Sequence, residues 1–140
     1  MLQRIQTIWL LLASACAFAG LNFPFYSGIH TSGEQQYALK GTENIFFILL
    51  TTGIGLLAFI AVFMYKNRQM QLKLSIAAIL LEAGLLYMYY HYTKIIFLTS
   101  TYNTYALWAV FQPAVLILLL LAIAGIRRDN KIIKESNRLR

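Results

Sequence analysis

Four long apolar stretches constrain this chain more than any other feature of its sequence. They cover about residues 5–23, 44–65, 72–90 and 105–126. An α-helix needs about 20 apolar residues to cross the hydrocarbon core of a bilayer. Open sheet edges are excluded there, because each backbone polar group in lipid needs a partner within the protein. The sequence therefore predicts an all-α membrane protein, a four-transmembrane-helix bundle forming a single domain over residues 1–140.

The composition agrees with lipid acting as part of the solvent. Hydrophobic residues make up 59% of the chain and charged residues only 12%, whereas about 25% of residues are charged in an ordinary soluble domain. The formal net charge is +7, and the basic residues cluster just beyond the ends of the apolar stretches. This position is typical of contacts with anionic lipid headgroups. We expect the bilayer, and no nucleic acid, as the partner of these charges.

The basic residues also predict an orientation. Of the twelve, only Lys40 and Lys94 lie in connections on one side; all the others lie on the opposite side. Short loops rich in Lys and Arg stay in the cytoplasm, so we expect both termini inside (N-in/C-in) in the bacterial inner membrane. The residues expected to contact lipid headgroups or a partner protein are Lys66, Arg68, Arg127, Arg128, Lys131, Lys134, Arg138 and Arg140.

The N-terminal stretch has a second interpretation. Arg4, the apolar run after it and the A-x-A-like Ala17-Phe18-Ala19 also fit a secretory signal peptide. Cleavage would leave three spans with the same cytoplasmic C-terminus, so the charge pattern does not separate the two cases. We expect the stretch to remain as the first span.

The segments outside the spans are predicted less sharply. Residues 24–43 are polar and rich in glycine, which predicts a partly ordered loop. The connection over residues 91–104 contains the β-favouring run 95–99, which fits either a short strand or an interfacial segment. The basic tail, residues 127–140, is expected to continue the fourth span as a helix along the inner membrane surface.

Glu82 is the most informative single residue. It lies about ten residues into the third stretch, which at 1.5 Å per residue is ~15 Å deep and near the midplane. A charged carboxylate at that depth costs ~2.5–3.5 kcal/mol on insertion scales, so it should face the bundle interior or a partner. Three interpretations remain open: a hydrogen-bonded or protonated side chain joining helices, a contact with a partner subunit, and a proton or ion site.

Further polar residues lie at similar depth in the other spans. Together with Glu82 they are expected to form one buried polar layer, whose members are Ser14, Thr51, Thr52 and Gln112. On the third span, the spacing of Ser75, Ala78, Glu82 and Tyr89 places them on one helix face, predicted to point inward. Pro113 is expected to kink the fourth span, because proline removes a backbone donor and clashes with the preceding turn.

No motif in the chain points to catalysis. His30 and His91 lie in separate connections and are too few for a metal site. The chain has no Ser/His/Asp set, no G-x-S-x-G elbow and no phosphate-binding loop. Cys16 stands alone within an apolar span and is interpreted as a packing residue. We therefore expect no catalytic residues, no metal and no cofactor.

Three segments of the chain carry a family resemblance. They are Met1-Leu2-Gln3-Arg4-Ile5-Gln6-Thr7, Lys66-Asn67-Arg68 with Gln71, and Gly125-Ile126-Arg127-Arg128-Asp129 through Asn137-Arg138-Leu139-Arg140. Through them the chain resembles, from end to end, the family called domain of unknown function 4293, small membrane proteins of Bacteroidota. The resemblance implies a four-span inner-membrane protein and no established activity.

Two functional hypotheses follow from these observations. The first is a non-enzymatic accessory or scaffolding subunit of a larger inner-membrane complex, because the chain is small, has no catalytic set and carries its basic segments on one face. The second is a small transporter or proton-handling protein centred on Glu82. Transporters usually have more spans or internal repeats, which favours the first hypothesis.

Overall fold

The chain folds into four helices and a small sheet, seen here in a computed structural model that describes residues 5–28, 37–96 and 103–138. The helices are α1 (Ile5–Asn22), α2 (Ile45–Phe63), α3 (Arg68–Ile96) and α4 (Phe111–Arg138). Two short 3₁₀ helices, η1 (Met64–Lys66) and η2 (Leu107–Val110), precede α3 and α4. All four α-helices are long and apolar enough to cross a membrane. The prediction of four helices able to span a membrane is therefore confirmed.

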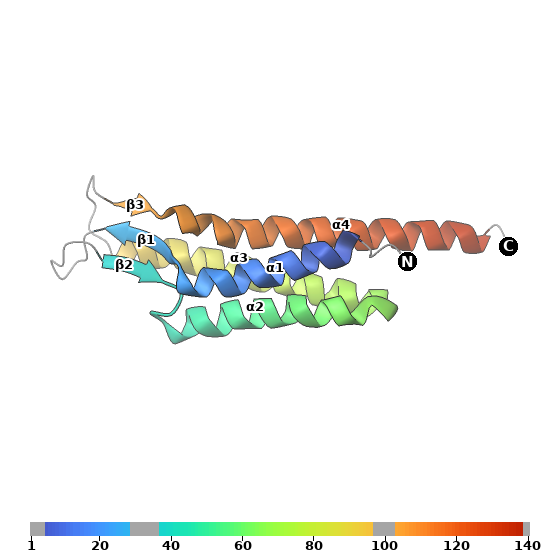
Figure 1. Ribbon diagram of the computed structural model, residues 1–140, viewed down its shortest axis with the longest axis horizontal. Coiled ribbons are helices and arrows are strands. Elements are labelled where there is room, and N and C mark those ends of the chain that lie inside the picture. The colour runs from blue at the N-terminus through green and yellow to red at the C-terminus, as the bar shows by residue number, and fades with distance from the viewer. Residues whose placement is uncertain (1–4, 29–36, 97–102, 139–140) are drawn as a thin grey trace.

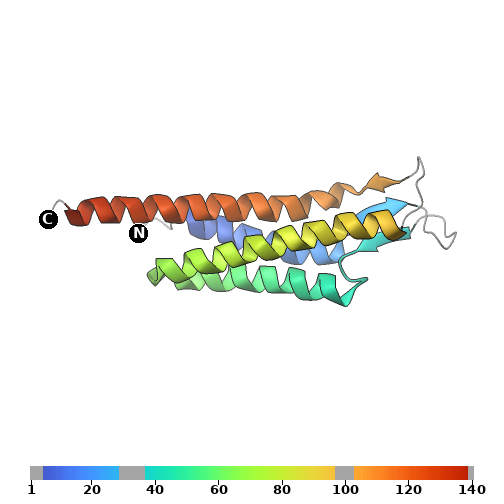
Figure 2. The same cartoon turned by 180° about the vertical axis from the view of Figure 1, so that it is seen from behind.

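The helices form an antiparallel bundle (Figure 1). α1 packs against α2 and α4, and α3 packs against the same two helices, so each helix contacts its neighbours in a closed ring. This is the up-down-up-down order that short connections favour. The opposite view shows the same arrangement, with η1, the start of α1 and the end of α4 at one end (Figure 2). We call this the basic end and the other the sheet end.

A three-stranded antiparallel sheet covers the sheet end. Its strands are β1 (Pro24–Gly28), β2 (Tyr37–Lys40) and β3 (Thr104–Tyr105), in the order β2-β1-β3. Tyr26 pairs with both Leu39 and Tyr105, and the register of β1 against β2 shifts between Pro24 and Tyr26. The prediction of a loop over residues 24–43 was therefore wrong for both strands. Backbone pairing orders them, β2 with β1 and β1 also with the distant β3, which local composition does not reveal.

The third helix is longer at both ends than its predicted span. α3 begins at Arg68 rather than at residue 72, because Asn67 caps it: its Oδ1 accepts a hydrogen bond from the Met70 N–H at 3.3 Å. It ends at Ile96 rather than at residue 90. The start of the predicted β-favouring run, Ile95–Ile96, is thus helical, and residues 97–102 lie outside the described part of the chain.

The fourth helix begins later than predicted, at Phe111 rather than at residue 105. Tyr105 belongs to β3, and the Ala106 N–H donates to the Phe25 carbonyl at 3.1 Å, so the chain there completes the sheet instead of a helix. Pro113 consequently lies in the first turn of α4, where a helix N–H has no intrahelical acceptor. The predicted kink inside the span was wrong, because proline fits that position without breaking a hydrogen bond.

At its other end α4 continues beyond the bundle. It runs as one straight helix to Arg138, past the ends of the other three helices (Figure 1). The predicted helical continuation of the fourth span is therefore present. It follows the axis of the span, however, instead of turning aside along a surface. Residues 139–140 lie outside the described part of the chain.

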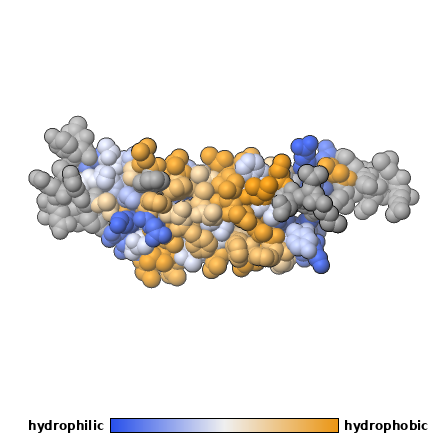
Figure 3. Space-filling view, viewed as in Figure 1, coloured by the Kyte–Doolittle hydropathy of each residue, from blue (hydrophilic) through white to orange (hydrophobic). Residues whose placement is uncertain are grey.

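Apolar side chains dominate the outside of the bundle as well as its interior. On the face seen in Figure 3, a broad apolar band covers the middle of the molecule, with hydrophilic residues toward both ends. Leu80, for example, is 69% exposed. Small side chains, by contrast, are fully buried between the helices: Ala13, Ala17, Ala58, Ala61, Ala78 and Ala122. Small residues allow close helix contact in lipid, so this distribution is that of a membrane protein.

Candidate functional site

In the middle of α3, the inward face is more polar than the outward face. The buried residues of this helix recur every three or four positions, at Gln71, Ser75, Ala78, Glu82, Leu85, Tyr89 and Thr93. The outward face instead carries exposed apolar residues such as Ile76 and Leu80. This reverses the pattern of a soluble helix, as expected where lipid replaces water. We call the buried polar residues of α3 the polar seam: Gln71, Ser75, Glu82, Tyr89 and Thr93.

Glu82 lies at the middle of the polar seam and is fully buried by the bundle itself. Neither of its carboxyl oxygens has a hydrogen-bond partner among the residues that the structure describes. The side chain therefore faces the interior, as one of the predicted alternatives required. Its carboxyl group is covered completely by the chain and makes no hydrogen bond to the described residues.

Ser14 and Gln112 are both buried, as predicted, but at different levels of the bundle. The Ser14 hydroxyl donates to the Gly55 carbonyl at 3.1 Å and so joins α1 to α2. The Gln112 amide packs against Gly20, with Nε2 3.1 Å from the position that a Cβ on this glycine would take. Gly20 is six residues from Ser14, or ~9 Å along α1. These two members of the predicted polar layer therefore lie at different levels along the bundle axis.

The two threonines of α2 differ in burial. Thr51 is fully buried, and its hydroxyl has no hydrogen-bond partner among the described residues. Thr52, the next residue, is only half-buried, because a helix turns about 100° per residue and points it away from the axis. Of the two, only Thr51 belongs with the buried polar side chains.

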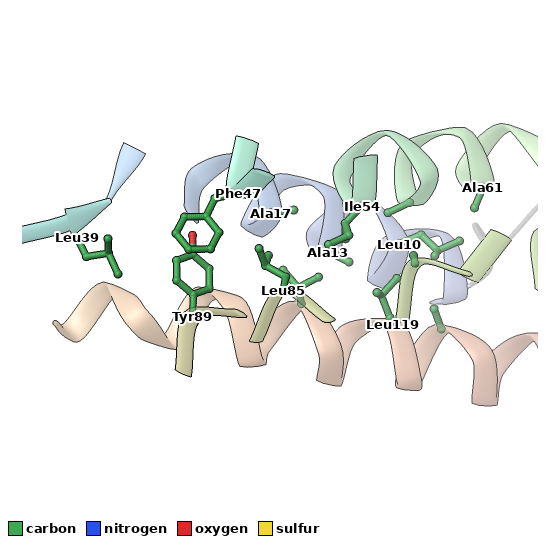
Figure 4. Packing of buried hydrophobic residues seen from close by; sticks show 14 residues of the cluster. Leu10, Ala13, Ala17, Leu39, Phe47, Ile54, Ala61, Leu85, Tyr89 and Leu119 are labelled. Carbon is green, nitrogen blue, oxygen red and sulfur yellow. The ribbon is translucent and has the colours of Figure 1, made fainter. Parts of the chain in front are cut away.

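An aromatic stack surrounds Tyr89, which lies in the polar seam between Glu82 and Thr93. The Tyr89 ring lies between Phe25 and Phe47, with ring centroids 4.3 Å and 4.4 Å away. The rings of Tyr89 and Phe47 are stacked on each other, and Figure 4 shows the two side chains next to each other. The Gln112 amide and the Glu82 carboxyl are the polar groups that act electrostatically on the Tyr89 hydroxyl. Tyr89 thus connects the seam to Gln112 while its ring fills the interior.

More aromatic residues hold the sheet on the bundle. The Tyr105 ring contacts Tyr26 edge-on at 5.0 Å, and Tyr92 contacts Phe47 edge-on at 5.1 Å. The Asn44 side chain donates to the Tyr92 hydroxyl and also caps α2 by accepting from the Phe46 N–H. Desolvation raises the pKa of the Tyr26 hydroxyl, and the neighbouring Tyr105 raises it further. The sheet end is therefore closed by packed rings.

A second polar group of residues joins three helices at the basic end. Gln6 Nε2 donates to Asp129 Oδ2 at 3.1 Å, and Arg68 Nη1 donates to the Asp129 backbone carbonyl at 3.4 Å. These bonds connect α1 and α3 to α4. Gly125 allows the close approach, because a Cβ there would lie only 3.2 Å from the Gln6 Cβ. We call Gln6, Arg68 and Asp129 the basic-end cluster.

Gln71 begins the polar seam three residues beyond Arg68. It is fully buried, and both atoms of its side-chain amide lack a hydrogen-bond partner among the described residues. Its backbone carbonyl accepts a hydrogen bond from the Ser75 hydroxyl at 2.9 Å. The first residue of the polar seam at the basic end is therefore a buried amide whose side-chain atoms have no hydrogen-bond partner among the described residues.

The basic residues predicted to contact headgroups or a partner have different surroundings. Arg68 is half-buried and bonded within the cluster, whereas the exposed ones are Lys66, Arg127, Arg128 and Lys131. Lys134 and Arg138 lie on the projecting part of α4, and Arg140 lies outside the described part of the chain. Within the described ranges, no group of three or more His, Cys, Asp or Glu residues could hold a metal ion.

The roles of Gln6, Gln71 and Asp129 were missed by sequence reasoning. They lie near the ends of helices, where polar residues are expected and carry no burial signal. The segments that carry the family resemblance contain all three, and the structure brings two of these segments into direct contact through Gln6 and Asp129. Arg68, from the third segment, also contacts Asp129. These segments therefore meet in space at the basic end.

Comparison with known proteins gives one finding. No curated protein and no solved structure matches the chain. A family model does match it, over residues 2–139, and the match confirms the resemblance carried by the two ends and the central turn. The chain belongs to the family described as Domain of unknown function (DUF4293).

Proposed function

We propose that the chain is a non-enzymatic accessory or scaffolding subunit of a larger complex in the inner membrane of Bacteroidota, with both termini in the cytoplasm. One observation carries this proposal: α4 leaves the bundle as a straight helix and ends well beyond it. A helix that serves only to cross the membrane has no need of such an extension.

The length of the extension decides what it can reach. Gln6 and Asp129 are bonded to each other near the start of α1, so Asp129 lies close to the edge of the apolar band. Arg138 is nine residues further, or ~14 Å along the helix axis. The headgroup layer on each side of a bilayer is only about 5–8 Å thick. A straight α4 therefore carries its last turn past the headgroups into water.

Charge indicates what the extension binds. Arg127 and Arg128 are exposed at the base of the extension, level with the headgroups, where anionic lipid is their expected partner. Lys134 and Arg138 lie further out on the helix, where lipid no longer competes. The occupant that fits is an acidic surface on the cytoplasmic side of a neighbouring subunit.

The test uses the full-length chain purified from native membranes in mild detergent. A photo-crosslinking amino acid replaces Ile132 on the extension, or Leu120 on the lipid-facing part of α4 as a matched position. We expect one protein to co-purify in fixed stoichiometry and to crosslink from position 132. In a tail variant, Gln replaces Lys131, Lys134, Arg138 and Arg140. In a control variant, Gln replaces Lys40 and Lys94.

The two charge variants separate the possible outcomes. The proposal requires that the tail variant loses the co-purifying protein and that the control variant retains it. Crosslinks from position 132 to lipid alone, or recovery of only the bare chain or its homo-oligomer, would contradict the proposal. Arg4, Lys66, Arg68, Arg127 and Arg128 remain in the tail variant, so its orientation should be unchanged.

A further inference from the structure

The interior of the bundle contains polar atoms that the described protein groups leave without partners. They belong to the side chains of Gln6, Thr51, Gln71, Glu82 and Gln112, all of them buried. Buried polar groups in proteins almost always have a hydrogen-bond partner, and where protein groups do not supply it, water does. Water inside the bundle is the partner that would satisfy these atoms.

The surroundings of Glu82 differ in the two directions along the axis. Toward the basic end, the next buried residues of α3 are Ala78 and then Ser75, both fully buried. Toward the sheet end, α3 continues with Leu85 and then Tyr89, whose ring is stacked between two phenylalanines. Small and hydroxyl side chains leave more room for water than Leu and stacked rings do.

We propose that Glu82 is a water-linked protonation site that opens toward the basic end of the bundle. The Glu82 carboxylate takes a proton from a hydronium ion in the internal water, which leaves a carboxylic acid and a water molecule. The reverse step returns the proton to water. The path passes Ala78, Ser75 and the amide of Gln71, and it does not continue past Tyr89. This site is independent of any subunit that α4 binds.

The helices packed around α3 contribute no charged side chain to the interior at the level of the spans. α1 over residues 5–22, α2 over residues 45–63 and α4 over residues 111–126 contain no Asp, Glu, Lys, Arg or His. Cys16, half-buried on α1, is the only thiol. Tyr89, on the same helix as Glu82, is the titratable side chain on which the carboxyl acts. A proton taken up in the interior is therefore held at Glu82.

The first experiment identifies the protonated group. The full chain in lipid nanodiscs is studied by infrared spectroscopy, which resolves the carbonyl stretching band of a protonated carboxylic acid in an apolar site. We expect this band to shift in D₂O and to be absent in Glu82→Gln. The matched control, Glu43→Gln, changes an exposed carboxyl at the sheet end and should keep the band. A band that remains in Glu82→Gln would overturn the assignment.

The second experiment tests the direction of access, through the rate at which the band shifts after transfer to D₂O. Ala78→Leu fills the path with a larger side chain and should slow the exchange, whereas Ala83→Leu adds the same atoms on the exposed face and should not. Ser75→Ala adds no volume and should also slow the exchange, so the test survives if Ala78→Leu does not fold. Exchange at the wild-type rate in both path variants would overturn access from the basic end.

Added salt distinguishes a proton from another cation. At constant pH, Na⁺ or Li⁺ should leave the intensity of the band unchanged. If either ion reduces the band to the same extent in the wild-type chain and in Glu43→Gln, the metal cation binds at Glu82. The proposal of a proton site is then overturned.

Discussion

Gln6 and Asp129, which are 123 positions apart in the chain, are joined by a hydrogen bond of 3.1 Å from Gln6 Nε2 to Asp129 Oδ2. The bond fixes α1 against α4 at the point where α4 leaves the bundle. It closes the ring of helices at the basic end, as β1 and β3 close it at the sheet end. The two closures lie at opposite ends of the same helix pair.

Removing the donor of this bond should weaken the bundle. Gln6→Leu is expected to lower the free energy of unfolding by about 1 kcal/mol, because the Asp129 carboxylate loses a partner in a partly buried position. The measurement is unfolding in mixed detergent and SDS, followed by circular dichroism. Arg128→Gln, at an exposed neighbouring position, serves as the control and should change stability by less than about 0.5 kcal/mol. Equal stability of the two variants would contradict a structural role for the bond.

The aromatic stack at the sheet end should depend on the Tyr89 ring rather than on its hydroxyl. Tyr89→Leu removes two stacked pairs, each worth about 0.5–1.5 kcal/mol beyond its area burial. Tyr89→Phe keeps both pairs and should lose less. Tyr87→Leu, on the exposed face of the same helix, is the matched control. Near-ultraviolet circular dichroism and the unfolding midpoint measure the effect. A larger loss of stability in Tyr89→Phe than in Tyr89→Leu would contradict the role of the ring.

Gly41 should tolerate no side chain. A Cβ there would lie 3.0 Å from the Tyr89 hydroxyl and 3.3 Å from the Gly20 carbonyl oxygen, and neither atom can move easily. Gly41→Ala is therefore expected to destabilise the fold by about 1–3 kcal/mol, the usual cost of overpacking. Gly53→Ala, where no atom lies within 4 Å of the added carbon, should be neutral or stabilising in the same unfolding assay. Similar losses of stability in Gly41→Ala and Gly53→Ala would show that steric overlap with the added Cβ is not the cause of the destabilisation.

The orientation can be tested with single cysteines in a Cys16→Ala background. Lys40→Cys places a thiol at the sheet end, and Arg128→Cys places one at the basic end, both at exposed positions. In intact spheroplasts a membrane-impermeant maleimide should label only the first. Both should react after the membrane is permeabilised. Labelling of Arg128→Cys in intact spheroplasts would reverse the predicted topology.

The spans were predictable because lipid imposes a simple rule of length and polarity. The inward face of α3 was also predictable, since Glu82 in an apolar helix has to be covered. The sheet was not, because β3 consists of Thr104–Tyr105 and is defined by its pairing with β1 rather than by its own composition. The start of α4 was mispredicted for the same reason.

The sequence predicts the depth of a polar residue along its own helix, but not its level relative to residues of the other helices. Counting along each span placed Ser14 and Gln112 in one layer, yet the relative axial shift of α1 and α4 separates them. That shift is set by contacts such as Gly20 with Gln112 and Gln6 with Asp129. Such contacts join residues from opposite ends of the chain, and hydropathy contains no information about them.

The straight course of α4 has a mechanical consequence. The helix is held near one end by Gln112 against Gly20 and further along by Asp129 against Gln6. Its last turns extend beyond the second of these contacts. A lateral force on the extension would therefore be resisted at Asp129, as the load on a cantilever is resisted at its support. The part of α4 from Phe111 to Asp129 is packed against α1 and α3 and would stay in place.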